Sequence, residues 1–316
     1  MKPIISDFTH FEKITPLRFD GASYKYAVQG NDSLYILKFE EHPRRKASIS
    51  HTHHHTSEYI GSHIYESIGL PTQETFLVKR DDRIAVACKH FCQGNTRLYS
   101  FKELATDFMH PSISKNSASQ AITTLEGTLE LISKQTVFQP KVLTDRYWDM
   151  FVVDAFIANS DRHNGNWGYL VDNHTFEVSL APIYDCGSSL FPLLTNEEMM
   201  TCLQSESMMK QLSANEPSST VRYKGAKINF LDFCRNYENP DFLAAVKRIV
   251  PRIDMDTIKA IITDTPVITD IRKEFLIHLL TLRKELLLEP ALKRAMKAEK
   301  ENSFNESESI DKGLER

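Results

Sequence analysis

The periodicity of apolar residues changes near residue 95, and this change limits the folds open to the chain. Before it, short runs rich in β-branched and aromatic residues, including YKYAV, LYILKF and RIAVACKHF, are typical of strands, with one helical segment between them at residues 57–68. After Phe101, apolar residues recur every three or four positions, as in RYWDMFVVDAFIAN and IRKEFLIHLLTLRKELL. This pattern predicts an α+β protein with a β-rich first lobe and a mainly helical second lobe.

The length of 316 residues is enough for two domains or one bilobed unit. We place the first lobe at residues 1–95 and the second at residues 96–296. The remaining residues 297–316 are polar and charged with little to bury, so we expect a disordered tail there.

The net charge of −4 and the isoelectric point near 6.3 give no overall positive field for binding polyanions. We therefore expect neither direct nucleic acid binding nor adsorption to a membrane surface. No window approaches the run of about 18 apolar residues that a spanning helix needs. The five cysteines form no CxxC pair, and the N-terminus lacks the apolar stretch of a signal peptide. These features predict a cytoplasmic protein with reduced thiols, and they leave export by a route without a signal peptide open.

The segment ANSDRHNGNWG, at residues 158–168, combines polar side chains with the end of an apolar helical run. Asp161 and Asn166 are five residues apart in it, as are the Asp and Asn of a protein-kinase catalytic loop. In that chemistry the Asp accepts the proton of the attacking hydroxyl, and the Asn amide oxygen binds magnesium. The alternative is an Asx-rich turn whose side chains only cap the backbone.

A second acidic motif lies downstream in APIYDCGSSL, where Asp185 follows a short apolar strand. Magnesium needs oxygen ligands, and a carboxylate, an amide oxygen and phosphates supply them. The sequence therefore predicts Asn166 and Asp185 as the two metal ligands. The alternative for Asp185 is a turn residue before Gly187.

Lys38 stands in the middle of the apolar strand LYILKF, where a free ammonium group is unusual unless it is paired. We predict that it binds the phosphates of ATP. Glu58 opens the helix of the first lobe and is the predicted partner of Lys38, with Glu66 on the same helix as the competitor. The alternative is an edge-strand lysine that extends to solvent.

Two further nucleotide contacts have weaker signals. A turn with a single glycine precedes the strand YKYAV and offers backbone N–H groups to phosphates, although it lacks GxGxxG. Its predicted phosphate-binding residues are Gly21, Ala22, Ser23, Tyr24 and Lys25. The end of RIAVACKHF predicts an adenine-binding hinge at Lys89, His90 and Phe91.

In this order the motifs resemble the HipA-like serine/threonine kinases, most of all the compact CtkA-type members, over residues 19–292. The resemblance implies a two-lobed protein-kinase-like fold with ATP and Mg²⁺ as cofactors and a protein as substrate. It implies that Asp161 is the catalytic base, that Asn166 and Asp185 bind magnesium, and that Lys38 binds phosphates. It also implies that His163 and Tyr184 border the nucleotide.

The chain departs from the family pattern near its N-terminus. Full-length HipA kinases carry an additional subdomain before the phosphate loop, which the short segment before Gly21 does not match, so an antitoxin partner does not follow from the resemblance. HipA-like toxins phosphorylate a serine ahead of this loop, where the present chain has LRFD. The candidate autophosphorylation sites are instead Ser23, Ser48 and Ser50.

The sequence thus predicts a serine/threonine protein kinase that phosphorylates itself, with a toxin or effector role as a further hypothesis. Two alternatives stay open. One is a phosphotransferase that acts on a small molecule of the aminoglycoside type, and the other is a kinase-shaped binding module without turnover.

Overall fold

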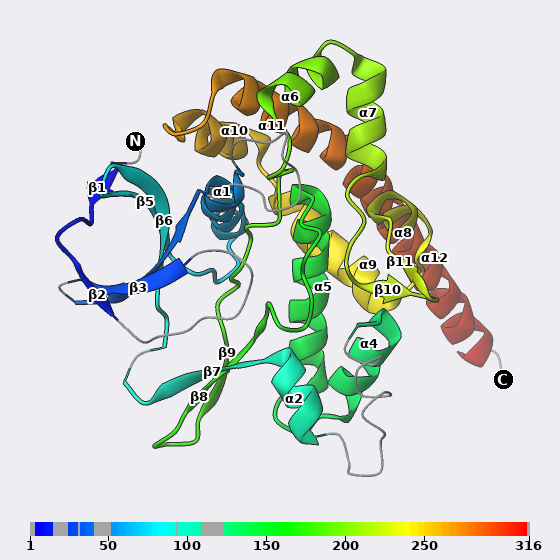
Figure 1. Cartoon of the computed structure of the whole chain (residues 1–316). Coiled ribbons are helices and arrows are strands. Elements are labelled where there is room, and N and C mark those ends of the chain that lie inside the picture. Colours follow the sequence, from blue (N-terminus) through cyan, green and yellow to red (C-terminus); the bar gives the residue numbers. More distant parts are fainter. Residues whose placement is uncertain are drawn as a thin grey trace.

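A computed structural model describes residues 4–14, 25–30, 32–40, 52–92, 94–108 and 123–314, with the backbone alone at 105–108 and 302–314. A curled sheet forms the first part of the molecule, and a larger helical part lies beside it (Figure 1). The observed order of elements follows the predicted change from strands to helices.

Among the residues that the structure describes, the first sheet has six strands in the order β1-β5-β6-β4-β3-β2. Only β1 and β5 run parallel, and the other neighbouring strands are antiparallel. The strands are β1 (Ser6–Asp7), β2 (Glu12–Ile14), β3 (Lys25–Gln29), β4 (Leu34–Phe39), β5 (Thr75–Arg80) and β6 (Arg83–Lys89).

Side chains alternate between the two faces of this sheet, as the period of two requires. Val86 and Cys88 of β6 belong to the core that includes helix α1 (His54–Ser67). Ala85 and Ala87 point to the other face and pack in a smaller cluster with Phe8. Lys38 of β4 lies opposite Val86 in the ladder, so it lies on the face that α1 covers.

A second sheet of three antiparallel strands connects the two parts, in the order β7-β8-β9. Its strands are β7 (Thr96–Ser100), β8 (Gly168–Asp172) and β9 (Val178–Leu180). Strand β8 follows the predicted catalytic loop, and β9 leads toward Asp185, so this sheet brings the two predicted loops together.

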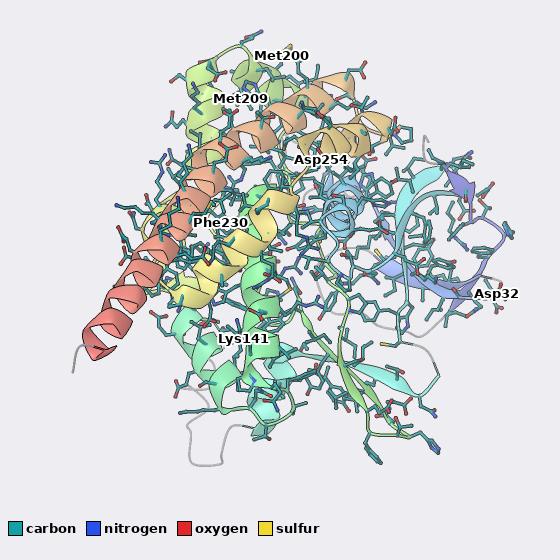
Figure 2. The ribbon with its side chains drawn as sticks, turned by 180° about the vertical axis from the view of Figure 1, so that it is seen from behind. Asp32, Lys141, Met200, Met209, Phe230 and Asp254 are labelled. Carbon is teal, nitrogen blue, oxygen red and sulfur yellow. The ribbon has the colours of Figure 1, made fainter. Side chains whose placement is uncertain are left out.

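Helix α5 (Pro140–Ile157) runs through the middle of the helical part and is buried along most of its length. Seen from behind, α9 (Pro240–Ile249) lies over it, and α12 (Glu289–Leu314) packs against α9 (Figure 2). Trp148 of α5 is fully buried and packs edge-on against Phe242 of α9, with ring centroids 5.4 Å apart. Aromatic burial of this kind contributes strongly to a helical core.

Shorter elements complete this part. They are α2 (Phe101–Phe108), α4 (Leu125–Lys134), α6 (Asn196–Leu203), α7 (Glu206–Asn215), the hairpin β10 (Arg222–Tyr223) and β11 (Ala226–Lys227), α8 (Phe230–Asn236), η1 (Val250–Arg252), α10 (Met255–Asp264), α11 (Asp270–Arg283) and the π-helical turn η2 (Lys284–Leu288). None of the helices within the described ranges is both long and apolar enough to cross a membrane.

The C-terminal segment differs from the prediction of a disordered tail, because α12 continues as a helix to Leu314. The segment is poor in apolar residues, but its Ala, Lys and Glu residues have high helix propensity. Lys297 and Glu301 form an i,i+4 ion pair at 3.6 Å, and Glu299 pairs with Lys247 of α9 at 2.7 Å. Low hydrophobicity therefore did not prevent helix formation here. The lobe boundary near residue 95 stays a prediction.

Candidate active site

The predicted catalytic loop begins where helix α5 ends. Ala158 adopts the left-handed conformation at the helix C-terminus, with φ 57° and ψ 40°, and its N–H bonds the carbonyl of Asp154. Such a residue ends a helix by turning the chain away from the helix axis. The loop that follows runs to Gly168 at the start of β8.

Asp161 and Asn166 are joined across this loop. The Nδ2 of Asn166 donates to the backbone carbonyl of Asp161 at 2.9 Å, which orients the amide with Oδ1 as its remaining acceptor. Burial raises the pKa of the Asp161 carboxyl, and nearby Asp185 raises it further, while His163 lowers it. A raised pKa makes a carboxylate a better proton acceptor at the pH where the enzyme works.

Lys38 lies between two carboxylates. Its Nζ is 2.8 Å from Oε2 of Glu58 and 3.1 Å from Oδ1 of Asp185. Although burial lowers the pKa of Lys38, Asp185 and Glu58 raise it well above its usual value, so the side chain is an ammonium ion. The other oxygen of Glu58, Oε1, accepts from the N–H of Cys186 at 3.1 Å. Of the two predicted partners, Glu58 is therefore the one that contacts Lys38, not Glu66.

Asp185 is held as an anion in an unusual backbone conformation. The charge of Lys38 lowers the pKa of Asp185 to about 2, despite burial. Its φ of 62° lies in the left-handed region, which non-glycine residues adopt mostly where the surroundings impose it. Part of this constraint comes from α1. Gly61 of α1 packs so closely against Cys186, the residue after Asp185, that a Cβ at Gly61 would lie 2.8 Å from the Cβ of Cys186. A Cβ at Gly187 would lie 3.1 Å from Oε2 of Glu58.

The predicted hinge has fewer donors than the sequence indicates. The N–H of Lys89 bonds the carbonyl of Glu74 at 2.9 Å, and the N–H of His90 bonds the carbonyl of Leu34 at 2.8 Å. Both N–H groups are thus hydrogen-bonded to backbone carbonyls of the first lobe, so they are not available to donate to an adenine base. Phe91 lies beyond them at the end of β6.

Tyr184 lies between the hinge and the catalytic loop. Its ring centroid is 5.8 Å from that of Phe91, and its hydroxyl donates to the carbonyl of Gly165 at 3.2 Å. His163 on the same loop accepts from the N–H of Gly165 through Nδ1 at 3.0 Å. Tyr184, Phe91 and His163 therefore lie in one neighbourhood, and their contact with the nucleotide stays a prediction.

Several predicted residues lie outside the described ranges: Gly21, Ala22, Ser23, Tyr24, Ser48 and Ser50. Lys25 is described and begins β3, opposite Lys38 in the ladder. Its charge is among those that lower the pKa of Asp185, so Lys25 lies on the same side of the sheet as this carboxylate.

The sequence did not single out Arg162 or Asp154, although both are buried in the site. The Nε of Arg162 is 2.9 Å from Oδ2 of Asp154. Its NH1 donates to the carbonyl of Asn166 at 2.7 Å and also to that of Tyr184. The sequence did contain a signal for this pair. Asp154 stands within the apolar run FVVDAFIA, and an aspartate in a helix that is buried on all sides needs a hydrogen-bonding or charged partner.

The donor set suits magnesium. Asp185 supplies an anionic carboxylate and Asn166 an amide oxygen, which are ligands that this hard cation prefers. Across the described ranges, no group of three or more His, Cys, Asp or Glu side chains could hold a metal ion. Magnesium bound with nucleotide commonly uses one or two protein oxygens and completes its shell with phosphates and waters. The residues therefore fit a magnesium–nucleotide complex.

Comparison with known proteins identifies the family of the chain. The HipA-like C-terminal domain family matches residues 17–259. The chain is 37% identical over 321 residues to the serine/threonine-protein kinase CtkA of Helicobacter pylori strain J99, covering 98% of this chain and 96% of that protein. The crystal structure of an H. pylori proinflammatory kinase CtkA superposes with a TM-score of 0.86 at 37% identity, over 93% of this chain and 99% of that one.

A more distant likeness supports the fold alone. HipA of Shewanella oneidensis MR-1, solved with HipB and its operator DNA, matches with a TM-score of 0.53 at 12% identity, over 90% of this chain and 66% of that one. The predicted two-lobed, HipA-like fold is confirmed by these matches. The chain is therefore a kinase that belongs to the HipA-like family.

Proposed function

We propose that this chain is a serine/threonine protein kinase that transfers the γ-phosphoryl group of Mg-ATP to a protein hydroxyl. The observation that carries this proposal is the position of Lys38, which contacts both Glu58 and Asp185. A lysine and a metal-binding aspartate brought together in this way are what a kinase needs to hold nucleotide phosphates. The name of the H. pylori relative, a serine/threonine-protein kinase, supports a protein hydroxyl as the acceptor.

Each residue has a distinct role in this proposal. Lys38 binds phosphate oxygens, and Glu58 keeps its ammonium group in place. Asp185 and Asn166 hold Mg²⁺, which neutralises phosphate charge when it is bound. Asp161 accepts the proton of the attacking hydroxyl as that oxygen bonds to the γ-phosphorus. The bond from the γ-phosphorus to the bridging oxygen breaks at the same time, and ADP leaves.

Incubation of the purified chain with γ-labelled ATP, Mg²⁺ and a cell lysate tests the proposal, with Asp161→Ala as the control. We expect label in protein, on serine or threonine, with the wild-type chain only. Label that appears only in small molecules would favour the small-molecule phosphotransferase instead. ATP binding without any transfer would favour the binding module without turnover.

Identifying the labelled lysate proteins by mass spectrometry would define the substrate. A toxin or effector role is a separate hypothesis, and comparing the growth of cells that express wild-type or Asp161→Ala chains tests it. HipB and operator DNA are partners of the Shewanella protein, and the proposal does not extend them to this chain.

A further inference from the structure

Asp154 and Arg162 form an ion pair beneath the active site, with 1% and 7% of each residue exposed. Besides the 2.9 Å contact from Nε, the NH2 of Arg162 lies 3.3 Å from Oδ1 of Asp154. Two charges removed from water are stable only if both are well hydrogen-bonded, and losing one partner leaves the other uncompensated. The orientation of Arg162 therefore depends on the charge of Asp154.

The other contacts of Arg162 go to the two loops that carry the proposed metal ligands. Its NH1 donates to the carbonyl of Asn166 at 2.7 Å and to the carbonyl of Tyr184, the residue before Asp185. Its NH2 also lies 3.6 Å from Sγ of Cys186, the residue after Asp185. One guanidinium group thus sets the spacing between the catalytic loop and the Asp185 segment.

Asp154 also contacts the helix that carries Glu58. Its Oδ1 accepts from the hydroxyl of Tyr65 at 2.7 Å and from Nδ2 of Asn159 at 2.8 Å. Tyr65 lies on α1, about two turns beyond Glu58, and is fully buried. A single carboxylate therefore links α1, the end of α5 and, through Arg162, both loops of the site.

We propose that Asp154 is a positioning residue, which uses Arg162 and Tyr65 to hold the catalytic loop, the Asp185 segment and helix α1 in the arrangement needed for phosphoryl transfer. Residues that orient metal ligands without touching the metal commonly change metal affinity or activity by about 10- to 100-fold when they are replaced. This role rests on the proposed function, so its test needs a measurement that does not depend on catalysis.

The same helix offers a matched control in Asp149, which is 8% exposed. It forms an ion pair with Arg248 of α9, whose NH2 is 2.6 Å from Oδ1 of Asp149. Asp149→Asn and Asp154→Asn therefore remove the same charge from the same helix, the first from a partly buried ion pair and the second from a fully buried one. Only Asp154 connects to the two loops of the site.

The experiment compares wild type, Asp154→Asn, Asp149→Asn and Tyr65→Phe at a temperature well below every unfolding midpoint. Steady-state kinetics over a Mg²⁺ titration give kcat, the KM for ATP and the Mg²⁺ requirement. Amide hydrogen exchange of residues 159–168 and 184–188, measured without nucleotide, reports the positioning itself.

We expect Asp154→Asn to lower kcat by about 10- to 100-fold, to raise the Mg²⁺ requirement and to speed exchange in both segments. Asp149→Asn should lower the unfolding midpoint without these changes. Tyr65→Phe removes only the hydroxyl that donates to Asp154 and keeps both the ion pair and the aromatic ring, so it should give smaller changes of the same kind. This variant replaces Asp154→Asn in the test if Asp154→Asn does not fold. If the wild-type chain transfers no phosphate, the proposed function fails, and hydrogen exchange still decides on the positioning role.

Unchanged exchange in both segments of Asp154→Asn, or of Tyr65→Phe if Asp154→Asn does not fold, would overturn the proposal. Equal losses of kcat in Asp154→Asn and Asp149→Asn would also overturn it, because they would indicate a general loss of stability.

Discussion

Asp161 and Asp185 belong to one site, yet their pKa values are shifted in opposite directions. Burial raises the pKa of Asp161, whereas Lys38 lowers that of Asp185 to about 2. These opposite shifts suit the proposed roles, in which one carboxylate accepts a proton and the other stays charged beside a cation. The two positions should therefore respond differently to the same substitution.

We predict that Asp185→Asn weakens Mg-ATP binding more than Asp161→Asn does. The first change removes a charged metal ligand, and the second removes mainly a proton acceptor. Calorimetric titration with Mg-ATP measures both affinities, and phosphoryl transfer should be lost in both variants. Equal losses of affinity would contradict this division of roles.

The pH dependence of kcat/KM should report the protonation of Asp161. As pH falls through its pKa, the carboxylate takes up a proton and no longer accepts one from the hydroxyl, so the rate falls. Because burial raises this pKa, the acid limb should lie above 3.8, the usual pKa of an aspartate.

Replacing His163 tests the assignment of this acid limb. His163 lowers the pKa of Asp161, so His163→Gln should move the limb to higher pH. His174→Gln, in the exposed turn between β8 and β9, is the control and should leave the limb in place. A shift to lower pH in His163→Gln would be inconsistent with this assignment.

At the scale of the elements, strand β4 and helix α1 meet through Lys38 and Glu58. The pair is nearly excluded from water, with 17% and 0% of the two side chains exposed. We predict that Lys38→Ala and Glu58→Ala are not additive in a phosphorylation assay, because each loses the same positioned ammonium group.

The matched control is the double-mutant cycle of Lys38→Ala with Glu66→Ala. Glu66 lies on the exposed side of the same helix as Glu58. Its effects should add. Additive losses in the Glu58 cycle would show that the ion pair does not act as a unit.

Strand β8 approaches β7 so closely that Gly168 has no room for a side chain. A Cβ there would lie 2.0 Å from the carbonyl oxygen of Tyr99 and 2.8 Å from the Cα of Ser100. Gly168→Ala should therefore push the strands apart and destabilise the protein by about 1–3 kcal/mol or more. Urea unfolding measures this, with Gly225→Ala as a control that has open space but a φ of 83°. A smaller loss at Gly168 than at Gly225 would contradict the steric argument.

At the scale of the whole molecule, residues 41–51 join β4 to α1 and so connect the elements that carry Lys38 and Glu58. They contain Ser48 and Ser50 beside the basic residues of PRRKAS. We predict autophosphorylation in the first lobe, at Ser48 or Ser50 if not at Ser23. A phosphate there adds about −1.5 to −2 charges and can form charge-assisted hydrogen bonds with arginine.

Intact mass and peptide mapping after incubation with Mg-ATP test this prediction. Asp161→Ala, incubated alone, should gain no phosphate. Phosphate confined to residues beyond 95, or none in the wild-type chain, would refute it.

The sequence by itself was enough to predict the two-lobed fold, and it singled out polar residues that the structure brings together. Hydrophobic periodicity reports which faces of strands and helices are buried, so the change near residue 95 indicated both lobes. The spacing of Asp161 and Asn166 is local, because a short loop keeps such residues together whatever surrounds it.

The tertiary structure decided every feature that depends on contacts between distant segments. It placed Glu58 rather than Glu66 beside Lys38, and it engaged the N–H groups of Lys89 and His90 within the first sheet. It also brought Arg162 against Asp154 and the carbonyl of Tyr184. A hydrogen bond needs two groups within about 3 Å and well aligned. Sequence separation does not reveal that distance, so only the folded chain shows which polar groups are paired and which are left to bind a substrate.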